Sequence, residues 1–104
     1  MAKTQIHCLP TELTIYSLGA LHPQCLAWLD EVPKSRGKRQ DTWPLDGASV
    51  NEVDAAGVQL LVSLAHSLKE RKRMLRLVNA SQPLVEACQV LGVTSLLDAK
   101  VTHE

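Results

Sequence analysis

The sequence predicts an α/β fold, with one small mixed β-sheet of about four strands flanked by about three to four helices. The first observation is that short runs of strand-like composition alternate with longer runs whose apolar residues recur at helical spacing. The second is composition: 45% of the 104 residues are hydrophobic and 21% are charged, as in a globular protein rather than a disordered chain. This length suits one core, so we expect a single domain over residues 1–104.

The first third of the chain predicts two short strands and a helix. Thr4–Leu9 has strand composition and is ended by Pro10, which is typical of an edge strand or a turn. Leu13–Tyr16 is rich in β-branched and aromatic residues and predicts a second strand. Leu18–Val32 has apolar residues at near-helical spacing. Pro23 lacks an N–H group, so this helix either begins near His22 or is kinked there.

The middle of the chain carries the strongest local signal for a helix. After a polar, basic stretch at 34–40, which we expect to be a loop, Thr42–Leu45 predicts a brief strand. Asp54 is a favoured N-cap, because its carboxylate accepts hydrogen bonds from the first N–H groups of a helix. Apolar residues follow it at helical spacing from Val58 to Leu68. The basic residues just beyond suit the negative end of the helix dipole.

The last third predicts one more strand and one more helix. Leu75–Val78 is a short apolar strand. The helix that follows tolerates Pro83 in its first turn and is closed by Gly92, a residue typical of helix C-termini. Leu96 and Leu97 fit either a last short strand or a helical turn, and we expect the tail at 98–104 to be loose.

Composition and charge exclude several classes of protein. Lys and Arg total 11 and Asp and Glu total 11, so the net charge is zero, unlike the strongly basic surface of a duplex nucleic-acid binder. No apolar run is long enough to span a membrane, and the N-terminus lacks the apolar run of a secretory signal. Three widely spaced cysteines suit a reducing compartment. We therefore expect a cytoplasmic protein that binds no nucleic acid and meets membranes only through a partner.

The sequence offers no clear site for metal binding or catalysis. A zinc site needs about four convergent ligands, and the nearest pair, His22 and Cys25, looks more like part of a turn. His7, His66 and His103 are scattered along the chain, so no nucleophile with a paired base stands out. No P-loop motif is present. We expect no metal, no cofactor and no enzymatic activity.

Four segments, taken in order, resemble the motifs of the STAS domain, the family of bacterial anti-sigma-factor antagonists. Thr11–Thr14 is similar to the Gly-Glu-Leu-Asp segment that leads into that family's first helix. Trp43–Asp46 matches its central strand, which ends in Asp. Val53–Gly57 matches its Asp-Ser-Ser-Gly or Asp-Thr-Ala-Gly signature, and Leu75–Gly92 matches its next strand, loop and helix. The resemblance is closest over Thr42–Gly92 and implies the STAS fold.

The resemblance also implies a surface that binds a protein partner, at the start of the second helix and in the loop before it. In that family the residue after the signature Asp is commonly Ser or Thr, and a kinase-like ATPase phosphorylates it and so breaks the complex. Ala55 stands there in this chain, so we expect no phosphorylation at that position. The partner-binding residues expected on this basis are Ser49, Asn51, Asp54, Ala55, Ala56, Gly57, Val58 and Gln59. The alternative is that Asp54 only caps a helix and the small residues only allow close packing.

Three functional hypotheses follow from these observations. The first is a non-catalytic module that resembles an anti-sigma-factor antagonist and binds a kinase-like ATPase or another signalling protein. The second hypothesis also comes from the resemblance. It is a small cytosolic accessory subunit of a phospholipid-transporting ABC complex, whose partner is a transport protein. The third hypothesis is a STAS domain that binds a nucleotide or another small ligand.

Overall fold

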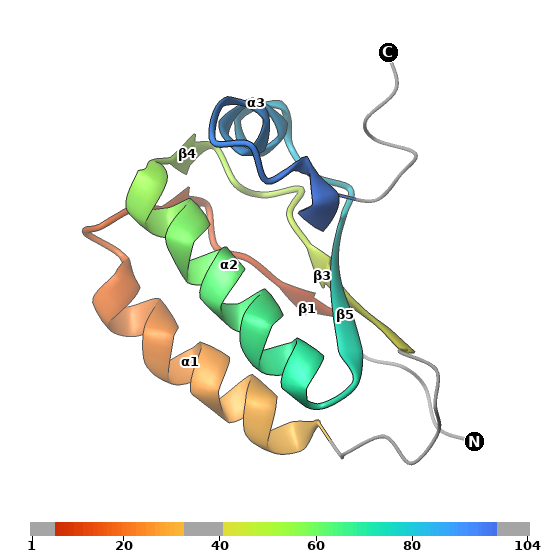
Figure 1. Ribbon diagram of the computed structural model, residues 1–104. Coiled ribbons are helices and arrows are strands. Elements are labelled where there is room, and N and C mark those ends of the chain that lie inside the picture. The colour runs from red at the N-terminus through yellow and green to blue at the C-terminus, as the bar shows by residue number, and fades with distance from the viewer. Residues whose placement is uncertain (1–5, 33–40, 98–104) are drawn as a thin grey trace.

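Helices and strands alternate along the chain in the computed structural model, which describes residues 6–32 and 41–97 (Figure 1). The helices in these ranges are α1 (Leu18–Glu31), α2 (Ala55–Glu70) and α3 (Gln82–Val90), followed by the 3-10 turn η1 (Thr94–Leu96). The strands are β1 (His7–Cys8), β2 (Glu12–Leu13), β3 (Asp41–Asp46), β4 (Glu52–Val53) and β5 (Arg73–Val78). The predicted α/β fold class is confirmed.

The strands in the described ranges form two parallel sheets, with orders β1-β3-β5 and β2-β4. We expected one mixed sheet, and Pro10 supplies a reason for the division, since it has no N–H to continue a ladder. The first sheet ends where the Leu9 N–H donates to the Asp46 carbonyl oxygen, 2.9 Å away. After the proline, the Thr11 carbonyl oxygen accepts hydrogen bonds from the N–H groups of Asn51 and Glu52 and so begins the second sheet.

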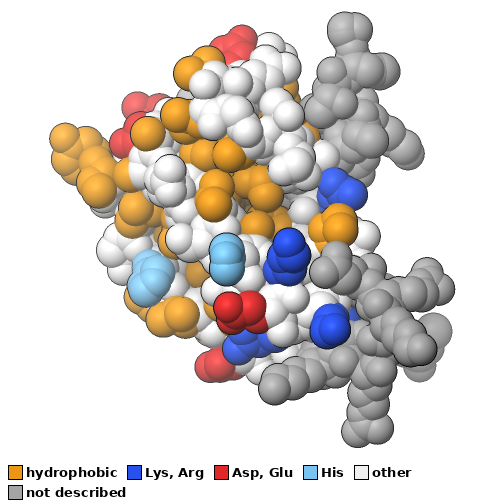
Figure 2. Space-filling view, viewed as in Figure 1, with side chains coloured by type: hydrophobic (Ala, Val, Ile, Leu, Met, Phe, Trp, Pro, Cys, Tyr) orange, Lys and Arg blue, Asp and Glu red, His pale blue; other side chains and the backbone are white. Residues whose placement is uncertain are grey.

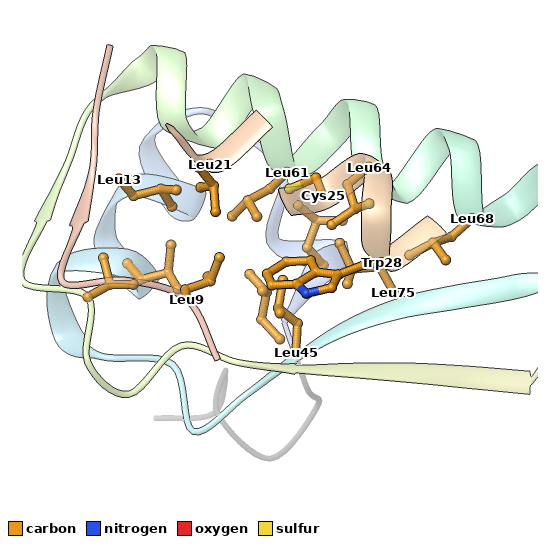
Figure 3. Packing of buried hydrophobic residues seen from close by; sticks show 14 of the residues in the cluster. Leu9, Leu13, Leu21, Cys25, Trp28, Leu45, Leu61, Leu64, Leu68 and Leu75 are labelled. Atoms are coloured by element: carbon orange, nitrogen blue, oxygen red, sulfur yellow. The ribbon is translucent and has the colours of Figure 1, made fainter. Parts of the chain in front are cut away.

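The helices α1 and α2 lie side by side over one face of the three-stranded sheet, and α3 lies near the end at which α2 begins (Figure 1). A parallel strand pair needs a long crossover connection, and these helices provide it. The core lies between the helices and the sheet. Figure 3 shows α1, α2 and the strands contributing to one cluster. Its labelled members include Leu21, Cys25 and Trp28 from α1, Leu61, Leu64 and Leu68 from α2, and Leu45 and Leu75 from the strands.

The predicted strand at Leu13–Tyr16 is wrong. Strand β2 ends at Leu13, and a turn follows in which the Thr14 N–H donates to Ser17 Oγ at 3.0 Å. The Ser17 N–H in turn donates to the Thr14 carbonyl oxygen at 2.9 Å. Strand propensity at Ile15 and Tyr16 is overridden because the hydroxyl of Ser17 offers the backbone a local alternative to a ladder.

The helix α1 begins before Pro23 and continues through it. It starts at Leu18 with Ser17 as the N-cap residue, so a start near His22 is wrong, and Pro23 lies inside the helix. The N–H that Pro23 lacks would have bonded to the carbonyl of Gly19, four residues earlier. Gly19 is exposed, so water can take the place of that donor.

Both alternatives for Leu96 and Leu97 are realised in part. The turn η1 ends at Leu96, and Leu97 then forms a single parallel bridge with Leu77 of β5. The expected loop at 34–40 and the expected loose tail at 98–104 lie outside the described residues, as do the first two residues of the expected strand Thr4–Leu9. No helix within 6–32 or 41–97 is long and apolar enough to cross a bilayer.

Candidate partner-binding site

Asp54 organises the start of α2, as the sequence predicts, and also holds a second element. Its Oδ1 accepts a hydrogen bond from the Gly57 N–H at 3.0 Å, which is the N-cap bond. Its Oδ2 accepts one from the Ile15 N–H at 3.1 Å, in the turn between β2 and α1. The N–H of Ile15 and then that of Gly57 lower the pKa of Asp54 below its usual range, because both bonds favour the carboxylate. One side chain therefore joins two segments 39 residues apart.

Gly57 lets α2 lie directly against β2. A Cβ atom at Gly57 would lie 2.0 Å from the carbonyl oxygen of Leu13, a distance that no side chain tolerates. The Asp54 N–H donates to the same carbonyl oxygen at 3.2 Å. Val58, the next residue of the helix, is 1% exposed. Gly57 and Val58 therefore support the predicted surface from beneath, and both are too buried to contact a partner.

The remaining predicted residues form an accessible surface around the first turn of α2. Ala55 is exposed, and Asp54 and Ala56 are half-buried. Ser49 and Asn51 are exposed in the loop that leads to β4, and Gln59 is exposed on the second turn of the helix. The structure therefore brings six of the eight predicted positions to the surface.

A groove of about 560 Å³ runs between this surface and α3, and we call it the α2–α3 groove. One wall contains Asn51, Asp54 and Ala55 from the predicted set. The other wall is α3, which the sequence did not assign to the site. The full lining is Asn51, Glu52, Val53, Asp54, Ala55, Pro83, Glu86, Ala87, Val90 and Leu91.

Large apolar side chains are exposed on both flanks of the α2 N-terminus. Ile15 and Tyr16 are 58% and 89% exposed on one flank, and Val90 is 83% exposed on the other. Figure 2 shows hydrophobic side chains gathered over the part of the molecule where α2 begins and α3 lies. The signal that could have revealed this flank was Val90, an apolar residue of α3 that lies away from the buried Leu84 and Cys88. Exposed apolar patches of this kind mark sites of protein association.

The carboxylates of the α2–α3 groove and the Lys and Arg residues of the described ranges lie at opposite ends of α2. Glu52, Asp54 and Glu86 line the α2–α3 groove, and no Lys or Arg does. Within residues 6–32 and 41–97, every Lys and Arg lies between Lys69 and Arg76, at the opposite end of the helix. A partner of the groove therefore meets apolar side chains and carboxylates.

In the comparison with protein families, residues 8–98 match the family described as "Mlab, STAS domain". The chain belongs to this family. The match spans the described elements from Cys8 of β1 to η1, together with the α2–α3 groove, and it confirms the resemblance seen in the sequence. Searches of curated proteins and of solved structures found no match for the chain. STAS domains are generally non-catalytic binding modules.

In this STAS domain the first residue of α2 is Ala55, exposed and without a hydroxyl group. The absence of phosphorylation at this position stays a prediction, because it rests on the motif alone. Ser49 and Ser63, the nearest hydroxyls in the sequence, are exposed too, but neither is the residue that follows the capping Asp.

Two cysteines and one histidine away from this site belong to the packing of the STAS domain. Cys25 and Cys88 are buried in the core, and burial raises the pKa of both thiols, that of Cys25 to about 11. His7 stacks on Trp28 with ring centroids 4.7 Å apart, and its Nε2 lies 3.3 Å from Oε1 of Glu31. No three His, Cys, Asp or Glu side chains gather as metal ligands within the described ranges.

Proposed function

We propose that this STAS domain is a non-catalytic accessory subunit of an ABC transporter, and that it binds a transporter protein through the α2–α3 groove. The observation that carries the proposal is the exposed apolar rim of the groove, at the helix end where the family motif lies. The family description supports a transporter partner better than a sigma-factor regulator. On this proposal the protein is cytoplasmic, uses no cofactor and meets the membrane only through its partner.

The chemistry of the first turn of α2 supports a complex that is not switched by phosphorylation. A phosphate at this position would add about −1.5 to −2 charges to a surface that already carries Asp54. Ala55 offers no oxygen to receive one, so binding is constitutive. An anti-sigma-factor antagonist of the partner-switching type needs that hydroxyl, which makes it the weaker hypothesis for this chain.

The geometry of the groove also favours a protein partner over a small ligand. Glu52, Asp54 and Glu86 would repel the phosphates of a nucleotide. Val90 is so exposed that a ligand lying in the groove would leave most of its side chain in water, whereas a protein surface would cover it. Nucleotide binding is therefore less well supported than protein association.

The test is co-purification of the tagged protein with the ATPase subunit of an ABC transporter from the same organism, using variants on each wall of the groove. Ala55→Asp and Val90→Asp should each weaken binding at least tenfold, because an added carboxylate must be desolvated at an apolar interface and joins others already there. Ser63→Asp is the matched control: it places the same charge at an exposed position of α2, eight residues or about 12 Å from Ala55.

The two outcomes of this test are distinct. Loss of binding in both groove variants, with unchanged binding of Ser63→Asp and similar melting temperatures for all three, supports the proposal. If Ala55→Asp and Val90→Asp bind the ATPase as tightly as the unchanged protein, the groove is not the docking site. A sigma regulator in place of a transporter protein among the co-purified proteins would favour the antagonist hypothesis.

A further inference from the structure

The opposite end of the molecule contains a second groove, along the outer edge of β5. It has a volume of about 380 Å³ and lies between Arg73–Arg76 of β5, Ala65 and Lys69 of α2, and Ser95 and Leu96 beside them. A smaller hollow of about 240 Å³ shares Ala65, Lys69, Ser95 and Leu96 with it and continues along α2 toward Val62 and Val93. We call the larger hollow the β5 groove.

The β5 groove is basic and has an apolar floor. Lys69 is exposed, Arg76 is half-buried, and no Asp or Glu is among the lining residues. Arg76 Nη1 donates to the carbonyl oxygen of Ser95 at 3.2 Å, a bond that leaves its charge without a counter-ion among the described residues. Arg73 already interacts within the protein, so the argument uses the charges of Lys69 and Arg76. Figure 2 shows Lys and Arg side chains in this part of the molecule.

Within residues 41–97, the strand edge that the groove follows is paired at one position. In the three-stranded sheet β5 is a terminal strand, paired with β3 on one side only. On its other side, the pairing found within 41–97 is the single bridge between Leu77 and Leu97. The stretch Met74–Arg76 thus presents N–H and C=O groups of alternate residues to the groove. Such an edge is a template for an added strand.

We propose that the β5 groove binds an extended acidic segment of a protein partner, which adds to the sheet as a strand beside Arg73–Arg76. The charge of the groove selects carboxylates, and the strand edge selects an extended backbone rather than a helix. A bilayer surface is flat and has no amide groups to pair with the edge, so it fits this concave site less well. The proposal concerns a site separate from the α2–α3 groove and does not depend on the proposed function.

The register of the strand predicts the pattern of the segment. Side chains alternate between faces, so Arg73 and Leu75 point to the helix side of the sheet, and Met74 and Arg76 to the other. Lys69, on α2, supplies a cation on the helix side of the edge, and Arg76 supplies one on the other side. A segment Glu-Val-Val-Glu places one carboxylate on each side, whether it runs parallel or antiparallel to β5.

The test measures binding of a labelled, end-capped peptide, Thr-Glu-Val-Val-Glu-Thr, to the full chain by fluorescence polarisation at low salt. We expect binding that Arg76→Glu and Lys69→Glu each weaken at least tenfold. Lys72→Glu is the matched control, because Lys72 is exposed at the same end of the molecule but does not line the groove, and it should change affinity less than twofold. The Ala55→Asp variant should bind the peptide normally, which separates this site from the first.

Two further peptides test the mode of binding. A version with Lys in place of Glu should not bind, because its charge matches that of the groove. A version with N-methyl groups on its backbone amides should bind at least tenfold more weakly, since it can neither donate to the edge nor approach it closely. Loss of binding with N-methylation supports strand addition. Equal binding of the methylated peptide, or no binding of the acidic peptide, would overturn the proposal. So would a protein that binds vesicles rich in phosphatidylglycerol but not the acidic peptide.

Discussion

Asp54 shows how one residue sets the geometry of the candidate site. Its two carboxylate oxygens accept N–H groups from α2 and from the β2–α1 turn. The first bond is local and follows from the N-cap preference of Asp. The second aligns the exposed Ile15 and Tyr16 beside the first turn of α2. The carboxylate therefore couples the apolar flank to the helix end.

The lowered pKa of Asp54 predicts a dependence of stability on pH. A carboxyl group whose folded pKa lies below its unfolded value of about 3.9 stabilises the fold fully above that value. This contribution is lost as the pH falls through the folded pKa. In Asp54→Asn the side-chain oxygen can still accept the Gly57 N–H, but the amide NH₂ cannot accept that of Ile15. Urea unfolding should show the variant less stable at pH 7, with a difference that shrinks below about pH 4. A difference that stays constant down to pH 2.5 would contradict this account.

Gly57 allows the backbone of α2 to lie close to the backbone of β2. In Gly57→Ala the new Cβ would lie 2.0 Å from the Leu13 carbonyl oxygen, so backbone must move. We expect a loss of about 1–3 kcal/mol in the free energy of unfolding, as for other overpacked sites. Gly19→Ala is the matched control, since nothing lies within 4 Å of its new Cβ and it sits in an exposed turn of α1. It should stabilise the protein by about 0.5–1 kcal/mol. Equal stability of the two variants in urea would contradict the tight contact.

At the scale of elements, α2 connects the two grooves and covers the sheet. Its buried face consists of Val58, Leu61, Leu64 and Leu68, in register with one side of a 3.6-residue helix. Its N-terminus enters the α2–α3 groove and its last turns line the β5 groove. The same helix thus borders an acidic, apolar groove at one end and, at the other, a groove whose cations are Lys69 and the arginines of β5.

The packing of α2 on the sheet predicts large losses on truncation. Leu61 and Leu64 are 0% and 3% exposed. Replacing either with Ala removes apolar burial and leaves a cavity, so we expect a loss of about 2–5 kcal/mol in chemical denaturation. Ser63→Ala, at the exposed position between them, should change stability by less than about 0.5 kcal/mol. If both Leu variants lost only a few tenths of a kcal/mol, the contribution of this face to the core would be much smaller than its burial indicates.

At the scale of the whole molecule, helices and sheet share one core. Cys25 of α1 and Cys88 of α3 belong to the same cluster of buried residues as Leu45 and Leu77 of the central strands. Cys8, on β1, is exposed. The Cys8 thiol therefore reports on the surface, and the thiols of Cys25 and Cys88 report on the packing of α1 and α3 against the core.

Thiol labelling tests whether that core unfolds as a unit. With a disulfide reagent at pH 8, Cys8 should react at once and Cys25 and Cys88 should not. Burial blocks access to both, and with a pKa of about 11 Cys25 holds little thiolate at that pH. As urea is raised, Cys25 and Cys88 should become reactive together, at the midpoint of the global transition. Reaction of Cys88 at a clearly lower urea concentration would show that α3 opens separately.

The sequence by itself determined the features that depend on neighbouring residues. Asp54 as the N-cap of α2, Pro83 in the first turn of α3 and Gly92 just beyond that helix at φ +74° all follow from local backbone chemistry. The motif around Asp54 also predicted the STAS family and the helix end at which the α2–α3 groove lies.

Tertiary structure alone decided which of these features meet in space. The division into two sheets depends on pairings such as Glu12 with Glu52, 40 positions apart. The second wall of the α2–α3 groove comes from α3, and the β5 groove forms where Ser95 and Leu96 lie near Arg76. Local patterns predict helices and strands because their hydrogen bonds join near neighbours. Grooves and strand edges arise from contacts between distant segments, and only the folded chain specifies those.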